Sequence, residues 1–77
     1  MKKILASDLF IYVKDKRKVR IVYRGKDEFE GAPLIGDHRI TEPVTPLFFD
    51  SLKGEITFER SNGKKDTKTA IEIFDPS

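Results

Sequence analysis

One stretch of the chain, residues 18–24, constrains the fold more than any other, because its period of two is typical of a β-strand with two unlike faces. The alternating positions are Val19, Ile21 and Tyr23 on one face and Arg20, Val22 and Arg24 on the other. The first set is β-branched or aromatic and packs well across a pleated surface. We therefore expect that face in the core and the other, mostly cationic face toward water or a ligand.

The length and composition of the chain exclude several classes of protein. At 77 residues there is room for one domain with one core, so we expect a single domain over residues 1–77. The absence of cysteine excludes disulfides and thiolate metal sites. The longest apolar run, residues 9–13, is far shorter than the ~20 residues of a membrane span, and no secretory signal is recognisable. These features predict a cytoplasmic protein that does not enter a membrane.

The net charge of +2 conceals two blocks of opposite sign. Residues 14–26 hold seven Lys or Arg and one Asp, for +6, whereas residues 27–59 hold two basic and eight acidic residues, for −6. Two such blocks attract one another in a compact fold, which explains the pattern without any ligand.

The apolar run at residues 9–13 allows two interpretations. Its β-branched and aromatic side chains suit a strand that is covered on both sides. In the rival helix, Ser7 would be the N-cap, and Leu5, Leu9 and Val13 recur at helical spacing. Position 10 is not the Glu or Gln that would complete a capping box, and we favour the strand.

Gly25 predicts the turn of a first hairpin, because glycine readily takes the positive φ that a tight turn needs. A two-residue loop would pair Val22 with Phe29, and a three-residue loop would pair Tyr23 with Phe29. We favour the second, which keeps the aromatic residues on the core face. We then expect a bend at Gly31 and Pro33.

The second half of the chain predicts a loop, a short element and a second hairpin. Residues 38–46 contain two prolines and indicate a loop with a short extended piece around residues 39–41, and residues 46–52 fit one turn of helix or a short strand. Residues 55–59 fit a strand with Ile56 and Phe58 inward.

Asn62 and Gly63 then mark the turn that leads to a last strand at residues 69–74. A tight turn would set Phe58 opposite Thr67. We favour a longer loop that sets Phe58 opposite Ile71, because it buries more apolar surface.

About five short strands with two hairpins predict a mostly β fold, namely a small five-stranded antiparallel barrel or rolled sheet of SH3-like or Sm-like architecture. The alternative is an α+β fold with one N-terminal helix on a four-stranded sheet.

A short apolar N-terminal element, Lys-Val-Arg-Ile-Val-Tyr-Arg, Glu-Phe-Glu-Gly and Leu-Ile-Gly-Asp follow one another in the first half of the chain. This order is similar to the first half of Sm-like RNA-binding barrels, in which a helix is followed by a strand and then by a strand that carries a glycine. After Asp37 the sequence contains no counterpart of the second Sm signature, so no functional residue is carried over from the resemblance.

The sequence gives no support for catalysis or for a cofactor. With no cysteine and with His38 as the one histidine, a catalytic triad is implausible. His38 beside Asp37 and near Glu42 lacks a regular ligand spacing, so we expect a histidine bonded to its neighbour rather than a metal site. We expect a protein that is not an enzyme.

Two candidate binding sites remain. The basic block, read as a hairpin over residues 14–26, is typical of a surface that neutralises phosphates. Its candidate nucleic-acid-binding residues are Lys16, Arg17, Lys18, Arg20, Arg24 and Lys26. The adjacent Phe48 and Phe49 would point to opposite sides of an extended segment, which leaves one ring free to contact a protein partner or a second copy.

We rank a protein-interaction or self-association module first, with an open strand edge and the region of Phe48 and Phe49 as its surface. A nucleic-acid-binding module that uses the basic block is the alternative.

Overall fold

The computed structural model describes residues 1–29, 32–40 and 42–77, and at residues 26–29 and 32–35 it describes the backbone alone. Strands dominate the described residues. The elements are β1 (Lys2–Lys3), a 3-10 turn (Ala6–Asp8), α1 (Leu9–Asp15), β2 (Arg20–Phe29), β3 (Ala32–Arg39), β4 (Thr45–Asp50), β5 (Glu55–Glu59) and β6 (Lys65–Asp75).

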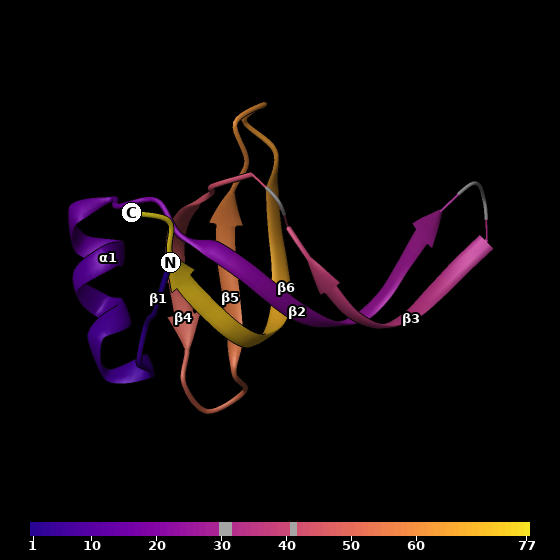
Figure 1. The fold of residues 1–77 in the computed structure, drawn as a ribbon, viewed down its shortest axis with the longest axis horizontal. Coiled ribbons are helices and arrows are strands. Elements are labelled where there is room, and N and C mark those ends of the chain that lie inside the picture. The colour runs from indigo at the N-terminus through magenta and orange to yellow at the C-terminus, as the bar shows by residue number, and fades with distance from the viewer. Residues whose placement is uncertain (30–31, 41) are drawn as a thin grey trace.

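All strands belong to one antiparallel sheet. Its order is β3-β2-β6-β5-β4, and β1 pairs with the C-terminal end of β6. Figure 1 shows α1 beside the sheet at one end of the molecule, while the β2–β3 hairpin projects at the opposite end.

The strand that the alternation predicts at residues 18–24 is confirmed as the first part of β2. Val19, Ile21 and Tyr23 are all buried. On the opposite face Arg24 is exposed and Arg20 is half-buried. Val22 is buried there as well, so it interrupts the cationic face.

The strand favoured for residues 9–13 is wrong, because these residues lie in helix α1. Leu9 is the one buried residue of the helix and Tyr12 packs against the core, whereas Phe10 and Ile11 are exposed. Ser7 is not its N-cap, since Ser7 lies within the 3-10 turn that leads into the helix. The helix ends at Lys16, which takes a left-handed conformation with φ 53° and closes the last turn through its N–H. The apolar character of the run therefore reflects an exposed helix face, not a strand buried on both sides.

The turn predicted at Gly25 is also wrong. Strand β2 continues to Phe29 and pairs without interruption with β3, so that Gly25 lies opposite Gly36. Neither proposed register occurs, because Val22 lies opposite Arg39 and Tyr23 opposite His38, and the predicted bend at Gly31 falls outside the described residues. Pro33 is part of β3, which is an edge strand, and edge strands tolerate proline better than central strands do.

The segment predicted as a loop at residues 38–46 begins in β3, in agreement with the extended piece expected around residues 39–41, of which residue 41 lies outside the described residues. His38 and Arg39 end β3, and the N–H of Ile40 donates to the carbonyl of Ile21 at 2.9 Å. Of the two alternatives for residues 46–52, the strand is correct, since β4 spans Thr45–Asp50.

Strand β5 is confirmed at Glu55–Glu59, with Ile56 and Phe58 completely buried. The turn at Asn62 and Gly63 is confirmed too, and the Oδ1 of Asn62 accepts the N–H of Lys64 at 2.9 Å. The register is wrong in both proposals, because Phe58 lies opposite Asp66.

Long polar side chains, and not Ile71, cover the aromatic rings of the core next to β5. Lys68 lies opposite Ile56 and places its ammonium 5.0 Å from the centre of the Tyr23 ring. The guanidinium of Arg60 lies 5.9 Å from the Phe58 ring. The stems of such side chains cover apolar surface while their charges stay in water. The register shift between β2 and β6 falls at Ile71, which removes that residue from the inner face.

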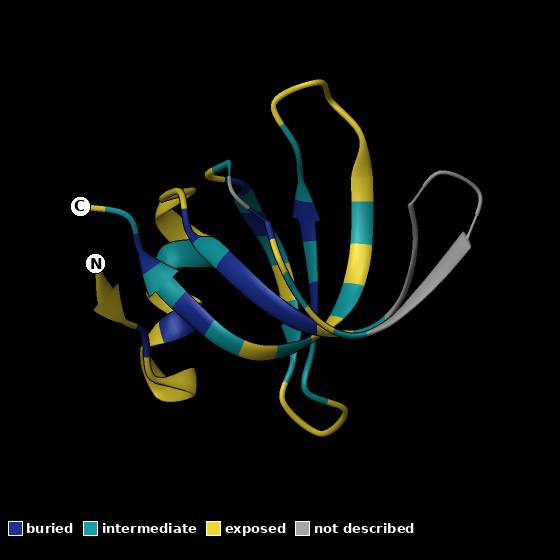
Figure 2. Ribbon diagram, turned by 45° about the vertical axis from the view of Figure 1, so that its right-hand side comes forward, coloured by how far each residue is buried: buried dark blue, intermediate teal, exposed yellow. Residues whose placement is uncertain are grey.

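The core is formed mainly by residues of the sheet and of the segments next to its strands, and α1 contributes one buried residue, Leu9. The buried residues of the core are Ile4, Leu9, Val19, Ile21, Tyr23, Ile40, Val44, Ile56, Phe58 and Ile73. Figure 2 shows these dark-blue residues gathered in the body, with exposed residues at the β5–β6 tip and the β4–β5 turn.

The fold is mostly β with a short helix, and the sheet is not closed. The first residue before β2 and the first before β4 do form a bridge, since Val19 and Val44 exchange two N–H···O hydrogen bonds of 2.9 Å. The mostly β prediction is confirmed, and the N-terminal helix of the α+β alternative is present as α1.

Candidate interaction surface

A hollow of about 410 Å³ lies between α1 and β4, and we call it the Phe10/Phe48 hollow. It is lined by Ala6, Phe10, Val13, Lys14, Phe48, Phe49 and Ser51. Phe10 is 65% exposed and Phe48 is 61% exposed, so both rings are accessible to a partner. Two large exposed aromatic side chains on one hollow are unusual for a small monomer and are typical of an interaction site.

Strand β4 supplies one wall of the hollow. Phe48 pairs with Thr57 and lies on the outer face, whereas Phe49 pairs with Ile56 and packs against the core. The sequence predicts that adjacent phenylalanines on an extended segment point to opposite sides, and this arrangement is present. A register shift between Pro46 and Phe48 is what allows Pro46 to be buried two positions before an exposed ring.

Helix α1 supplies the other wall. Leu9 anchors the helix in the core at 1% exposure, and the next residue, Phe10, therefore lies on the outer side of the helix. Val13, one turn after Leu9, lines the hollow. The prediction of a strand at residues 9–13 does not bring Phe10 and Val13 to the hollow. The helical spacing of these two residues is the signal in the sequence that points to it.

A lysine gives the hollow a positive rim. Lys14 lines it, and within the described part of the chain no carboxylate lies within ion-pair distance of that ammonium. The carboxylate of Asp50 accepts the N–H groups of Leu52 and Lys53 and thereby fixes the β4–β5 turn. The arrangement suits an apolar ligand that carries negative charge.

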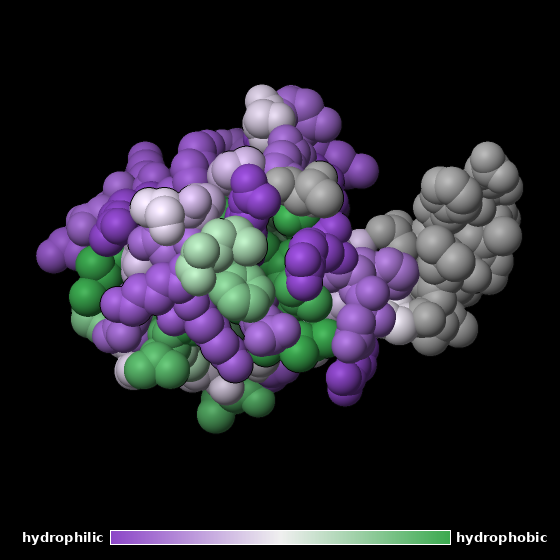
Figure 3. Space-filling view, in the orientation of Figure 1, coloured by the Kyte–Doolittle hydropathy of each residue, from purple (hydrophilic) through white to green (hydrophobic). Residues whose placement is uncertain are grey.

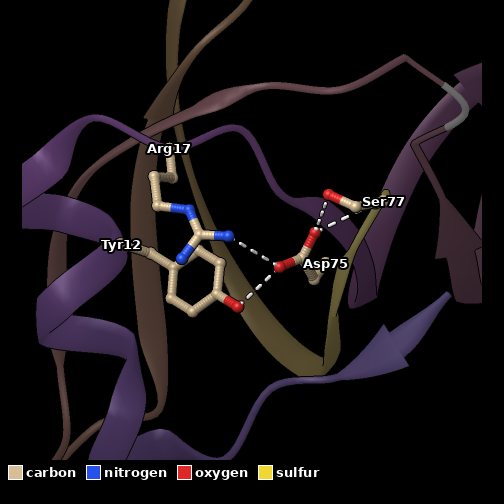
Figure 4. A network of polar contacts seen from close by, with 4 residues as sticks. All are labelled: Tyr12, Arg17, Asp75 and Ser77. Atoms are coloured by element: carbon tan, nitrogen blue, oxygen red, sulfur yellow. Dashed lines mark hydrogen bonds and ion pairs between the residues drawn. The ribbon is translucent and has the colours of Figure 1, made fainter.

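A polar network fixes α1 on the sheet (Figure 4). The carboxylate of Asp75 accepts hydrogen bonds from the Tyr12 hydroxyl at 2.7 Å and from Arg17 at 3.2 Å. It also accepts the N–H and the hydroxyl of Ser77 at 2.9 and 2.7 Å. The guanidinium of Arg17 stacks 4.6 Å from the centre of the Tyr12 ring. The network joins the helix, the loop after it and the end of β6.

This network changes the pKa of two groups. The hydrogen bond from Tyr12, followed by those from Ser77, holds the pKa of Asp75 well below its ordinary range. The same bond to Asp75 raises the pKa of the Tyr12 hydroxyl, because a deprotonated oxygen could not donate it. The network therefore holds α1 against the sheet, and the charges of Asp75 and Tyr12 do not change near neutral pH.

The predicted basic hairpin over residues 14–26 is not a hairpin. This segment runs from the end of α1 through a loop into β2. Lys16 ends the helix, Arg17 is bound to Asp75, and the ammonium of Lys18 donates to Thr45 at 2.7 Å.

The remaining candidates for nucleic-acid binding lie on β2. Arg20 is half-buried, and Arg24 makes an ion pair of 3.1 Å with Asp37 on β3. Lys26 belongs to the part of β2 of which the backbone alone is described. The segment thus distributes its charges over three elements.

The described residues contain no group of three or more His, Asp or Glu side chains that could hold a metal ion. The His38 ring stacks on that of Tyr23, with centroids 5.2 Å apart. None of the helices in the described part is long and apolar enough to cross a membrane. The face seen in Figure 3 is mainly hydrophilic, with apolar side chains in separate groups.

Comparison of the chain with protein-family models, with curated proteins and with solved structures gives no match.

Proposed function

We propose that this protein is a small, non-enzymatic interaction module that binds an apolar, acidic segment of a protein chain in the Phe10/Phe48 hollow. The observation that carries the proposal is the exposure of both rings, 65% for Phe10 and 61% for Phe48, on a single hollow. Aromatic anchors of this kind supply most of the binding energy in protein interfaces.

The electrostatic surroundings support a ligand with carboxylates. Lys14 stands at the rim of the hollow, and in the described part of the chain it has no acidic partner of its own. A carboxylate next to an apolar anchor would pair with Lys14 while the anchor fills the hollow. Strand β4 is an edge of the sheet, so an extended segment could also add to its backbone.

Nucleic-acid binding is the weaker alternative. Of its six candidate residues, Arg17 and Arg24 are engaged in ion pairs, and Arg20 is half-buried. A phosphate would have to compete with Asp75 and Asp37 for these cations. A rolled sheet of SH3-like or Sm-like architecture and a cytoplasmic location belong to the proposal as well, and both rest on the sequence.

The test is the binding of a labelled peptide with the sequence Glu-Phe-Asp-Leu-Glu, followed by fluorescence anisotropy. We expect Phe48→Ser to weaken binding by about tenfold or more, as the loss of one aromatic anchor does. Leu52→Ser is the matched control, because Leu52 is 97% exposed and does not line the hollow. A peptide that does not bind, or equal effects of the two substitutions, would refute the proposal.

A further inference from the structure

We call residues 25–36, the distal part of the β2–β3 hairpin, the arm. In the described part of the arm, residues 25–29 and 32–36, β2 and β3 have no further strand beside them. Strand β6 pairs with β2 only as far as Arg24, opposite Thr69, and then continues along β5. From the pair of Gly25 and Gly36 to that of Phe29 and Ala32, β2 and β3 pair with each other alone among the described strands. Figure 1 shows the arm projecting away from the body.

A two-stranded ribbon of this length is marginally stable in water. The base of the arm is weaker still, because Gly25 and Gly36 face one another and neither brings a side chain to pack on the next pair. Both outer edges of the ribbon expose backbone groups that can pair with another chain. The arm is therefore expected to gain its stability from a surface outside this ribbon.

Charge indicates what kind of surface that is. Residues 25–36 contain one lysine and three acidic residues, a net charge of −2, which leaves +4 for the rest of a chain whose total is +2. The arm also contains Phe29, Leu34 and Ile35. Its composition, apolar residues among carboxylates, is the chemistry that the Phe10/Phe48 hollow with Lys14 at its rim would take.

The arm cannot reach the hollow of its own chain. The molecule extends over 37 Å along its longest axis, and α1 lies at one end of that axis while the arm projects at the other. The complementary surface is available only on another molecule.

We infer that the arm of one copy of this protein docks in the Phe10/Phe48 hollow of a second copy. This inference rests on the proposed function and names its ligand. The contact joins two different surfaces, so each copy carries one donor arm and one receptor hollow.

Because the two surfaces are separate, they can be removed separately. In the first variant, Asn-Gly replaces residues 27–34, which closes the hairpin at the existing pair of Lys26 and Ile35 with a two-residue turn. In the second variant, Phe48→Ser damages the hollow and leaves the arm intact.

Sedimentation velocity up to about 1 mM, where weak contacts become populated, measures the association. We expect the wild type to associate and each variant to associate at least about tenfold more weakly. An equimolar mixture of the two variants is expected to form a one-to-one complex, because the mixture still contains one intact arm and one intact hollow. If the arm-shortened chain does not fold, Asp27→Lys with Glu28→Lys reverses the charge of the arm and keeps every backbone pair.

A wild type that is monomeric at every concentration would overturn the inference. A mixture of the two variants that remains monomeric would do so too, and so would a Phe48→Ser variant that associates as strongly as the wild type. The arm-shortened monomer keeps the result separate from the proposed function. If it still binds the Glu-Phe-Asp-Leu-Glu peptide while the wild type does not self-associate, the hollow binds a different protein. If the arm-shortened monomer does not bind the peptide and the wild type does not self-associate, the proposed function fails as well.

Discussion

Replacement of Leu9 by alanine tests whether residues 9–15 form the helix that builds one wall of the hollow. Leu9 is the one buried residue of α1 and is 1% exposed. The substitution removes three buried carbons, worth about 0.8 kcal/mol each in transfer free energy, and leaves a cavity. We therefore expect the free energy of unfolding to fall by about 3 kcal/mol.

The matched control is Ile11→Ala, two positions along the same helix. Ile11 is 40% exposed, so its loss is expected to cost about 1 kcal/mol or less. Urea unfolding followed by circular dichroism measures both values, and with a slope of about 1 kcal/mol per molar urea the midpoints should differ by about 2 M.

The comparison separates the helix from the strand. Residues 9 and 11 would share one face of a strand and would then cost similar amounts, whereas on a helix they lie about 200° apart. Equal destabilisation by the two substitutions would refute the position of α1 and, with it, the geometry of the hollow.

Three further outcomes are expected. Lys16→Gly should raise the free energy of unfolding by about 0.5–1 kcal/mol in the same urea assay, because Lys16 ends α1 in a left-handed conformation that favours glycine; a loss of stability would contradict this. Asp75→Asn should lower the urea midpoint at pH 7 and lower it less at pH 3. The depressed pKa of Asp75 stabilises the fold above the unfolded-state pKa of about 3.9, and that contribution is lost as the pH falls further; equal losses at both pH values would exclude it. An RNA oligonucleotide should bind weakly at low salt and not at physiological salt, and anisotropy that persists there and disappears with Arg20→Glu plus Arg24→Glu would favour the nucleic-acid alternative.

The sequence predicts correctly those strands in which apolar and polar residues alternate in a pattern that fits a strand and not a helix. The alternation at Val19, Ile21 and Tyr23 and that at Ile56 and Phe58 both appear as strands with these residues buried. In each case β-branched and aromatic residues occupy one face and polar residues most of the other, so propensity and pattern agree.

The errors occur where an apolar residue is exposed or a glycine lies within a strand. Phe10 and Ile11 suggested burial on two sides, but on α1 they face outward, and only tertiary packing decides this. Gly25 suggested a turn, yet it lies opposite Gly36 in a longer hairpin. A local pattern does not contain the partner strand, so these pairings could not be predicted.

The candidate site was predicted in part. The pair of Phe48 and Phe49 indicated one exposed ring, which is present. The helix wall with Phe10 was missed because it depends on the position of α1 beside β4.

The most direct measurement of the proposed binding site is a titration of the isotope-labelled, arm-shortened monomer with the Glu-Phe-Asp-Leu-Glu peptide, followed by amide and aromatic NMR shifts. The account predicts shifts concentrated at Phe10, Val13, Lys14 and Phe48, with the rings of Phe10 and Phe48 changing together. Shifts centred on the β2 arginines, or none at saturating peptide, would contradict it.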